Sequence, residues 1–200
     1  RRGAAQQVLL AEAPARLRVE TLGLFGQPAL VFAAEPPRFA LFVAEEGRLY
    51  VGPGVPRRLA VLPQGLGLDD LVAVLLGRVP RSALVGAASG ELSVLERERL
   101  YQLDVPLPEG ERWRIRVAAD AGYPVAVARL AADGGPRVAV RYDDFRPTAA
   151  GPFPYLLEVV EPERQVTARI EYQEIELNPA LPPGAFRLAT PRGAVPVELE

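Results

Sequence analysis

The chain has few of the side chains with which enzymes move protons or attack substrates. It contains no His and no Cys. Its serines stand at Ser82, Ser89 and Ser93, and because the chain has neither His nor Lys, none has a base that could make it a nucleophile. No glycine-rich loop follows a predicted strand and opens a helix, as a phosphate-binding loop would. We therefore expect a protein that is not an enzyme and needs no cofactor.

Adjacent aspartates are the remaining candidates for metal or acid–base chemistry. Asp69-Asp70 stand at the start of a predicted helix over Leu68–Gly77, where carboxylates suit the exposed N–H groups. Asp143-Asp144 stand at the end of a predicted hairpin strand. We interpret the first pair as helix capping and the second as a strand end, and we predict no metal site.

The charge composition argues against a nucleic-acid partner. The chain has 23 basic residues, all Arg, against 25 acidic ones, and its formal net charge is −2. No apolar run approaches the roughly 20 residues of a transmembrane helix. The chain begins with Arg1 and not with Met, so we expect that a signal peptide, or a lipid-modified Cys, precedes it.

Short runs of alternating charged and apolar residues predict a protein made mainly of β-strands. In Arg112–Val117 the arginines fall on one side of a strand and Trp113, Ile115 and Val117 on the other. A short helix over Arg2–Ala13 and the helix over Leu68–Gly77 complete the prediction, and we expect a bulge near Gln173-Glu174. The predicted strands cover residues 15–25, 28–34, 38–45, 48–51, 57–62, 91–105, 111–118, 123–131, 136–145, 153–160, 164–177 and 185–190.

Some segments are apolar on every side, so other parts of the protein must pack against them on both sides. Arg38–Glu45 is apolar on both strand faces, and the helix over Leu68–Gly77 has almost no polar face. A curved antiparallel sheet of about 11 strands with helices in its concavity has these properties. Either its two sides meet in a closed core or a cavity remains for an apolar guest.

The order of these segments resembles a known family. The apolar helix in Leu66–Gly77 is followed by Gly122–Ala128, by the strand tract Ile170–Asn178 and by a closing tract over Pro182–Pro191. This order is similar to that of the LolA/LolB superfamily of bacterial lipoprotein carriers, and especially to LolB-like outer-membrane lipoproteins. The resemblance covers nearly the whole chain.

The resemblance implies a single domain over residues 1–200, with fold class mainly β (α+β). In it, an antiparallel half-barrel of about 11 strands holds helices that plug its concave side and encloses a hydrophobic cavity. Residues 1–14 would be the tether and first helix, and 67–77 the lid helix. The implied function is non-catalytic binding of lipid acyl chains or lipidated proteins by a monomer. The implied place is the periplasm of a Gram-negative bacterium, at the inner face of the outer membrane, with a lipid anchor upstream of the chain.

The apolar strand faces and the lid helix supply the predicted wall of the cavity. It consists of Leu17, Val19, Phe32, Phe39, Leu41, Leu71, Leu75, Trp113, Ile115, Val125, Val127, Val138, Val140, Leu157, Ile170 and Tyr172. LolB-type proteins carry an apolar loop tip between early strands, but the matching turn here, Ala44–Gly47, is short and acidic. Leu62 and Leu66 are therefore the candidates for membrane contact. Two alternatives stay open: an interaction or sensor module of the cell envelope on the same fold, and a structural lipoprotein with a closed core.

Overall fold

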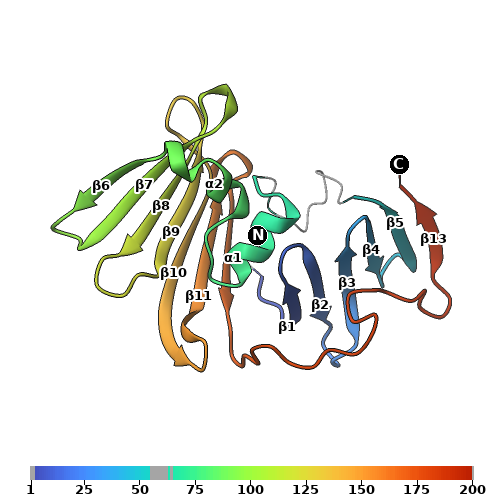
Figure 1. Ribbon diagram of the computed structural model, residues 1–200. Coiled ribbons are helices and arrows are strands. Elements are labelled where there is room, and N and C mark those ends of the chain that lie inside the picture. The colour runs from blue at the N-terminus through green and yellow to red at the C-terminus, as the bar shows by residue number, and fades with distance from the viewer. Residues whose placement is uncertain (1–2, 55–62, 64, 200) are drawn as a thin grey trace. The chain divides into compact units, whose positions relative to one another are not determined.

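The computed structural model describes residues 3–54, 63 and 65–199, and this part of the chain forms 13 strands in two sheets (Figure 1). The chain divides into two compact units. One, here called the terminal unit, comprises Arg1–Leu59 and Pro179–Glu200. The other, the central unit, comprises Ala60–Asn178. The prediction of a mainly β protein with antiparallel sheets is confirmed, but the strands form two sheets and not one.

The terminal unit contains a six-stranded sheet. Five strands follow one another as antiparallel neighbours in chain order, and the last strand of the chain pairs in parallel with the fifth. The strands are β1 (Gln7–Glu12), β2 (Arg16–Leu22), β3 (Pro28–Glu35), β4 (Arg38–Val43), β5 (Arg48–Pro53) and β13 (Val195–Glu198).

The two faces of this sheet differ in what they carry. Val19 lies opposite Phe32, and Phe32 lies opposite Leu41, so one face is apolar across three strands. On the other face Arg18 donates hydrogen bonds to the carbonyl oxygens of Ala185 (3.2 Å) and Arg187 (2.9 Å). The C-terminal segment is thereby held against the charged face of the sheet.

The central unit contains a seven-stranded sheet in which every strand is antiparallel to its neighbours. Its strands are β6 (Glu91–Leu95), β7 (Leu100–Pro106), β8 (Arg112–Ala118), β9 (Pro124–Leu130), β10 (Pro136–Thr148), β11 (Gly151–Glu161) and β12 (Val166–Glu171). Two α-helices precede them, α1 (Leu68–Leu75) and α2 (Arg81–Val85), and three short 3₁₀ turns occur at Ala87–Ser89, Pro108–Gly110 and Pro162–Arg164.

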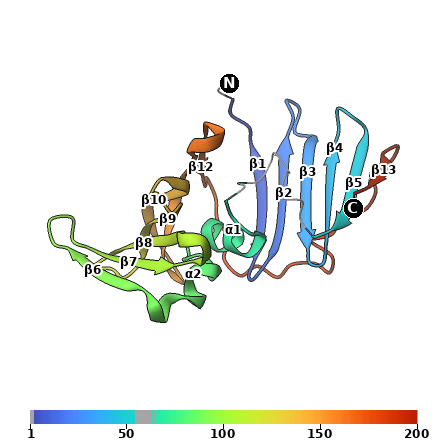
Figure 2. The same ribbon diagram turned by 90° about the horizontal axis from the view of Figure 1, so that it is seen from above.

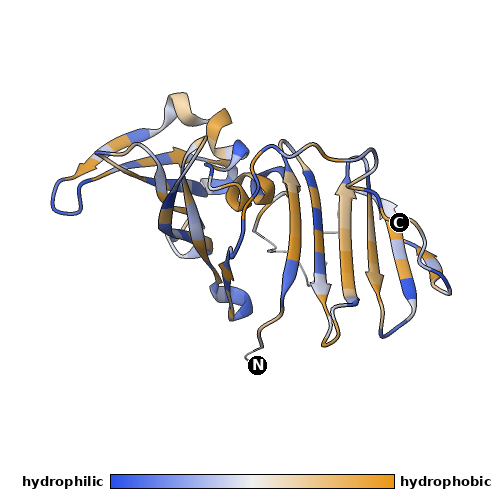
Figure 3. Ribbon diagram, turned by 90° about the horizontal axis from the view of Figure 1, so that it is seen from below, coloured by the Kyte–Doolittle hydropathy of each residue, from blue (hydrophilic) through white to orange (hydrophobic). Residues whose placement is uncertain are grey.

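Alternation along β7 and β8 gives this sheet a polar outer face and an apolar inner face, and the same alternation is visible by colour in Figure 3. On the outer face Arg114 donates two hydrogen bonds, at 2.8 and 3.0 Å, to the carboxylate of Asp104. Beside it Arg116 donates to Gln102 at 3.0 Å. The inner face carries Trp113, as the alternation in Arg112–Val117 predicts.

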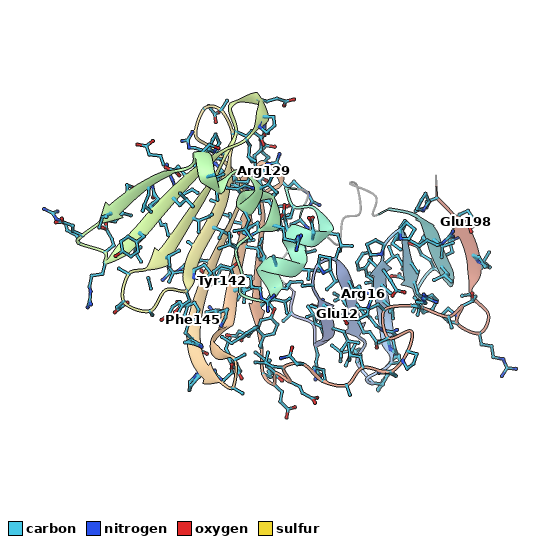
Figure 4. All side chains as sticks on the ribbon, in the orientation of Figure 1. Glu12, Arg16, Arg129, Tyr142, Phe145 and Glu198 are labelled. Carbon is cyan, nitrogen blue, oxygen red and sulfur yellow. The ribbon has the colours of Figure 1, made fainter. Side chains whose placement is uncertain are left out.

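The N-terminal segment is a strand and not the predicted helix. Its side chains (Ala, Gln, Leu and Glu) favour a helix, but Leu9 lies opposite Val19 in the sheet and Glu12 forms an ion pair with Arg16 at 2.9 Å (Figure 4). Pairing with β2, in register from Gln7 to Glu12, supplies backbone hydrogen bonds along one side of this segment. Tertiary context therefore overrides local propensity here.

Three other predicted strands differ from the structure, and a fourth falls where the structure is not described. The prediction over 91–105 joins two strands, because the turn at residues 96–99 separates β6 from β7. The strand predicted over 164–177 ends at Glu171, so no bulge forms near Gln173-Glu174. No strand forms at 185–190; the closing strand is β13, further along the chain. The strand predicted over 57–62 lies outside the described residues.

Candidate functional site: the apolar inner face of the central unit

The inner face of the seven-stranded sheet carries a continuous apolar cluster, here called the inner-face cluster. A single row crosses four strands: Ile115 lies opposite Val127, Val127 opposite Val140, and Val140 opposite Val159. The buried members of the cluster are Val74, Ala83, Val105, Trp113, Ile115, Val127, Val138, Val140, Tyr142, Leu157 and Val159. Partly buried residues around it include Leu66, Leu103, Val117, Phe145, Ile170 and Tyr172.

The segment over residues 65–86, here called the helical cover, lies over this cluster and is fastened to the sheet by hydroxyl groups. The Tyr142 hydroxyl donates a hydrogen bond to the carbonyl of Arg78 (3.1 Å), and the Tyr172 hydroxyl donates to the carbonyl of Leu75 (2.9 Å). Both acceptors lie at or just beyond the C-terminal end of α1, where helix carbonyls lack partners within the helix. Burial raises the pKa of both tyrosines, so both hydroxyls remain donors at ordinary pH. Figure 4 labels Tyr142 on the central sheet.

A third attachment passes through the buried carboxylate of Asp70. Asp70 accepts hydrogen bonds from the backbone N–H (2.9 Å) and the hydroxyl (2.7 Å) of Ser82, and the Trp113 indole N–H donates to the same Ser82 oxygen at 2.8 Å. The N-cap of α1 is Gly67, and no side chain caps that helix. The prediction that Asp70 caps α1 is therefore wrong: its carboxylate binds the first turn of α2. In the described part of the chain, no group of three or more His, Cys, Asp or Glu side chains could hold a metal ion.

Glycines allow the helical cover to approach the sheet closely. Gly77 has φ +67°, and a Cβ added there would stand 2.7 Å from the Cδ of Pro154 on β11. A Cβ at Gly86 would stand 2.9 Å from Cγ1 of Val105 on β7. With Pro154 and Val105 in place, a Cβ at Gly77 or Gly86 forces the cover or the sheet to shift, so the cover is seated on the sheet on both sides of α2.

The structure divides the predicted cavity residues between the two units. In the central unit, Trp113, Ile115, Val127, Val138, Val140 and Leu157 belong to the inner-face cluster, and Ile170 and Tyr172 pack against it. Val125 is half-buried on β9, and Leu71 and Leu75 are buried on α1, but the cluster residue of α1 is Val74. In the terminal unit, Leu17, Val19, Phe32, Phe39 and Leu41 share one face of the six-stranded sheet.

Sequence reasoning missed Val105, Tyr142 and Val159 as members of the cluster. Residues alternate in Arg137–Tyr142 so that Tyr142 falls on the same strand face as Val138 and Val140, and that signal could have identified it. Ala83 belongs to a helix of five residues, which is too short to give a periodic pattern.

The structure also bears on the predicted membrane-contact residues. Leu66 packs against the inner-face cluster, which accounts for its apolar side chain, and Leu62 lies outside the described residues. The large apolar side chains exposed at a loop tip are Leu24 (96% exposed) and Phe25 (91% exposed), between β2 and β3. The tip is held by hydrogen bonds within the turn, including one of 2.7 Å from the N–H of Gly23 to the carbonyl of Gln27.

Solved structures resemble the chain over nearly its whole length. A LolA-superfamily protein, NE2245 from Nitrosomonas europaea, superposes with a TM-score of 0.58 at 12% identity, over 92% of this chain and 81% of its own. A domain from Vibrio parahaemolyticus, named for outer-membrane lipoprotein sorting, superposes with a TM-score of 0.55 at 8% identity, over 90% and 79%. The chain has the fold of the LolA superfamily. The resemblance predicted from the sequence is thus confirmed for the fold.

The sequence itself matches no protein-family profile and no curated protein. TM-scores of 0.58 and 0.55 establish a common fold, and because the identities are only 12% and 8%, the ligand has to be argued from the chain's own residues. None of the described helices combines the length and the apolar character needed to cross a bilayer.

Proposed function

We propose that this LolA-fold protein binds the acyl chains of lipids or lipidated proteins in the bacterial periplasm, as a non-catalytic carrier or acceptor. The observation that carries the proposal is the inner face of the central unit. An apolar row across four strands lies beneath a helical cover, and the cover is attached to the sheet by hydrogen bonds from Trp113, Tyr142 and Tyr172. In this proposal the two units work as one domain over residues 1–200, with α1 as the lid.

The energy available from acyl binding is large compared with the attachments of the cover. Each methylene that leaves water contributes about 0.8 kcal/mol, so a chain of ten methylenes contributes roughly 8 kcal/mol before the costs of binding. Each neutral hydrogen bond of the cover contributes about 0.5–1.5 kcal/mol. An acyl chain that displaces the cover and opens a hydrophobic cavity over the inner-face cluster therefore offsets the broken hydrogen bonds, and it takes the place of the apolar contacts that Val74 and Ala83 of the cover make with the cluster. The apolar face of the terminal unit is a second candidate surface for the same kind of ligand.

We assign membrane contact to the β2–β3 tip in place of Leu66, and the prediction for Leu62, which lies outside the described residues, stays a prediction. Leu24 and Phe25 are adjacent and almost fully exposed, and burial of such side chains in lipid contributes about 1.5–3 kcal/mol each. That amount suits reversible contact at the inner face of the outer membrane, with a lipid on an upstream Cys as the permanent anchor.

A reversible cross-link between the helical cover and the sheet tests the proposal. The chain has no Cys, and a Cβ at Gly86 would lie 2.9 Å from Cγ1 of Val105, so the double variant Gly86→Cys, Val105→Cys places two sulfurs within bonding reach. A fluorescent C11 fatty acid is the probe. We expect the oxidised variant to bind it at least tenfold more weakly than the reduced variant. The reduced form of the same protein is the matched control.

Equal binding by the two redox forms refutes displacement of the cover. Absence of probe binding by the unmodified protein, together with absence of bound lipid in a native mass spectrum of material from the cell envelope, refutes the carrier function itself. That second result favours the alternative of an envelope interaction or sensor module. The exposed apolar residues Leu92 and Val94 on β6 are the observation that supports the alternative.

A further inference from the structure

Two tyrosine hydroxyls stand beside the apolar side chains of the inner-face cluster and donate to carbonyl oxygens of the helical cover. Tyr142 on β10 is 3% exposed and donates to the carbonyl of Arg78 at 3.1 Å. Tyr172, which directly follows β12, donates to the carbonyl of Leu75 at 2.9 Å. The strands β10 and β12 flank β11 in the central sheet (Figure 2). The sheet thus offers two hydroxyl donors, and the cover supplies a carbonyl acceptor to each.

The sheet, and not the cover, holds both tyrosines in place. Tyr142 lies opposite Leu157, a fully buried residue of β11. The backbone N–H of Tyr172 donates to the carbonyl of Tyr155 at 2.9 Å. The Tyr172 ring also packs on the ring of Phe153, with centroids 5.8 Å apart. When the cover is displaced, the two hydroxyls therefore keep their positions and lose their acceptors.

A plain hydrocarbon in place of the cover leaves both hydroxyls buried without an acceptor. An unpaired buried donor carries a desolvation cost, and a site built around such donors rejects a ligand that cannot pair with them. A ligand with carbonyl oxygens at the head of its apolar chains restores both hydrogen bonds. The inner face therefore favours a ligand of this kind over an alkyl chain.

The charges beside the cover favour a neutral carbonyl over a carboxylate. Arg129 contacts the start of the cover through the carbonyl of Gly65 at 3.3 Å, but its charge is balanced by Glu111 at 2.7 Å. The two tyrosine hydroxyls are neutral donors. An ester carbonyl can pair with them without the cost of burying a charge.

We propose that Tyr142 and Tyr172 recognise the two ester carbonyls of a diacyl ligand, so that the site selects acyl esters over alkyl chains of equal length. The ester oxygens take the places of the Leu75 and Arg78 carbonyls, and the acyl chains lie on the apolar row of the sheet. This selectivity rests on the proposed binding of acyl chains, and it adds the residues that distinguish one apolar ligand from another.

Two glycerolipids that differ only in their carbonyl oxygens test the selection. Dioctanoylglycerol joins its chains to glycerol through esters, whereas dioctylglycerol joins chains of the same length through ethers. Each lipid is titrated against the unmodified protein loaded with the fluorescent fatty acid. We expect the diester to displace this probe at a concentration at least about tenfold lower than the diether, because the diester alone supplies carbonyl acceptors.

The ratio of the two affinities separates recognition from a structural role of the hydroxyls. Loss of a hydroxyl also loosens the cover, but that change acts on both lipids alike and leaves the ratio unchanged. Tyr142→Phe and Tyr172→Phe should each lower the ratio, and the double variant should bring it close to one. The matched control is Tyr123→Phe. The Tyr123 ring stacks on Phe145 beside the cluster, with centroids 4.0 Å apart, and this variant should retain the full ratio.

The outcomes distinguish this selectivity from the proposed function. Equal displacement by the diester and the diether in the unmodified protein overturns selection by the hydroxyls and leaves acyl binding intact. A folded double variant that keeps the full ratio also overturns it, and Trp113 emission shows that the variant is folded. Failure of the fluorescent probe and of both lipids to bind refutes the proposed function, and the selectivity with it.

Discussion

Replacing Asp70 by Asn separates the hydrogen-bond role of this residue from helix capping. The carboxylate is buried, 5% exposed, and accepts two hydrogen bonds from Ser82. In the variant the amide oxygen can still accept from the Ser82 N–H, but the amide NH₂ then faces the Ser82 hydroxyl. That hydroxyl already accepts from Trp113, so its own proton is left without an acceptor.

The magnitude follows from these contacts. A hydrogen bond to a charged group contributes about 1.5–3 kcal/mol, and one buried group left unsatisfied costs about 1–3 kcal/mol. We expect Asp70→Asn to lower the free energy of unfolding of the central unit by about 2–3 kcal/mol. If the aspartates only capped α1, the loss would be about 1 kcal/mol or less, because Asn also caps helices. The neighbouring variant Asp69→Asn is the control, and it should change stability by less than about 0.5 kcal/mol.

Urea unfolding followed by Trp113 fluorescence measures this effect where it occurs. Trp113 is the single Trp of the chain and belongs to the same network, so its emission reports the central unit directly. Ser82→Ala breaks the network from its centre, and in a double-mutant cycle the two changes should be strongly non-additive. Equal, small effects of Asp69→Asn and Asp70→Asn, or additive effects of Asp70→Asn and Ser82→Ala, refute the network.

Three further predictions concern titration and core packing. The hydrogen bond from Arg114 lowers the pKa of Asp104 below the unfolded value of about 3.9. The stabilisation from this carboxylate is therefore present above that pH and is lost as the pH falls through the folded pKa. Asp104→Asn should reduce the acid-side decline of the urea midpoint, and an unchanged decline contradicts this. Burial raises the pKa of Tyr172, so the free energy of unfolding should fall as the pH rises above the unfolded value of about 10. Tyr172→Phe removes the hydrogen bond to the Leu75 carbonyl and should cost about 0.5–1.5 kcal/mol at pH 7. A full alkaline decline in this variant would count against the assignment. Phe186 is buried, so Phe186→Ala should destabilise the terminal unit by about 3–5 kcal/mol. Amide hydrogen exchange in β2 and β3 should become faster, while Trp113 emission stays constant. Unchanged slow exchange in both strands would show that the C-terminal segment is dispensable.

Regular alternation predicted the interior of the sheets well. Where Arg or Glu alternates with Val, Ile or Trp, as in Arg112–Val117, the strand and its buried face follow directly from the period of two. The helix over Leu68–Gly77 was equally clear, because Gly77 at φ +67° ends it and its apolar residues leave no polar face.

The missed features depend on partners that lie outside the segment itself. The segment Gln7–Glu12 becomes a strand because β2 pairs with it, and β13 becomes a strand because β5 does. The role of Asp70 depends on Ser82, which the chain brings to it through α2. Nothing in the local sequence around Asp70 distinguishes a cap of its own helix from an acceptor for the next one.

The return of the C-terminal segment to the terminal unit has a consequence for the order of folding. Arg18 is bonded to Ala185, a residue 167 positions later, and β5 obtains its parallel neighbour only when β13 has been made. The central unit, whose strands pair with their neighbours in sequence, is in effect an insertion within the terminal one. Because synthesis starts at the N-terminus, the sheet of the terminal unit is begun first and completed last. Until then the charged face of β2 and the edge of β5 lack the partners that the last 22 residues supply, so the terminal unit stays incomplete for most of synthesis.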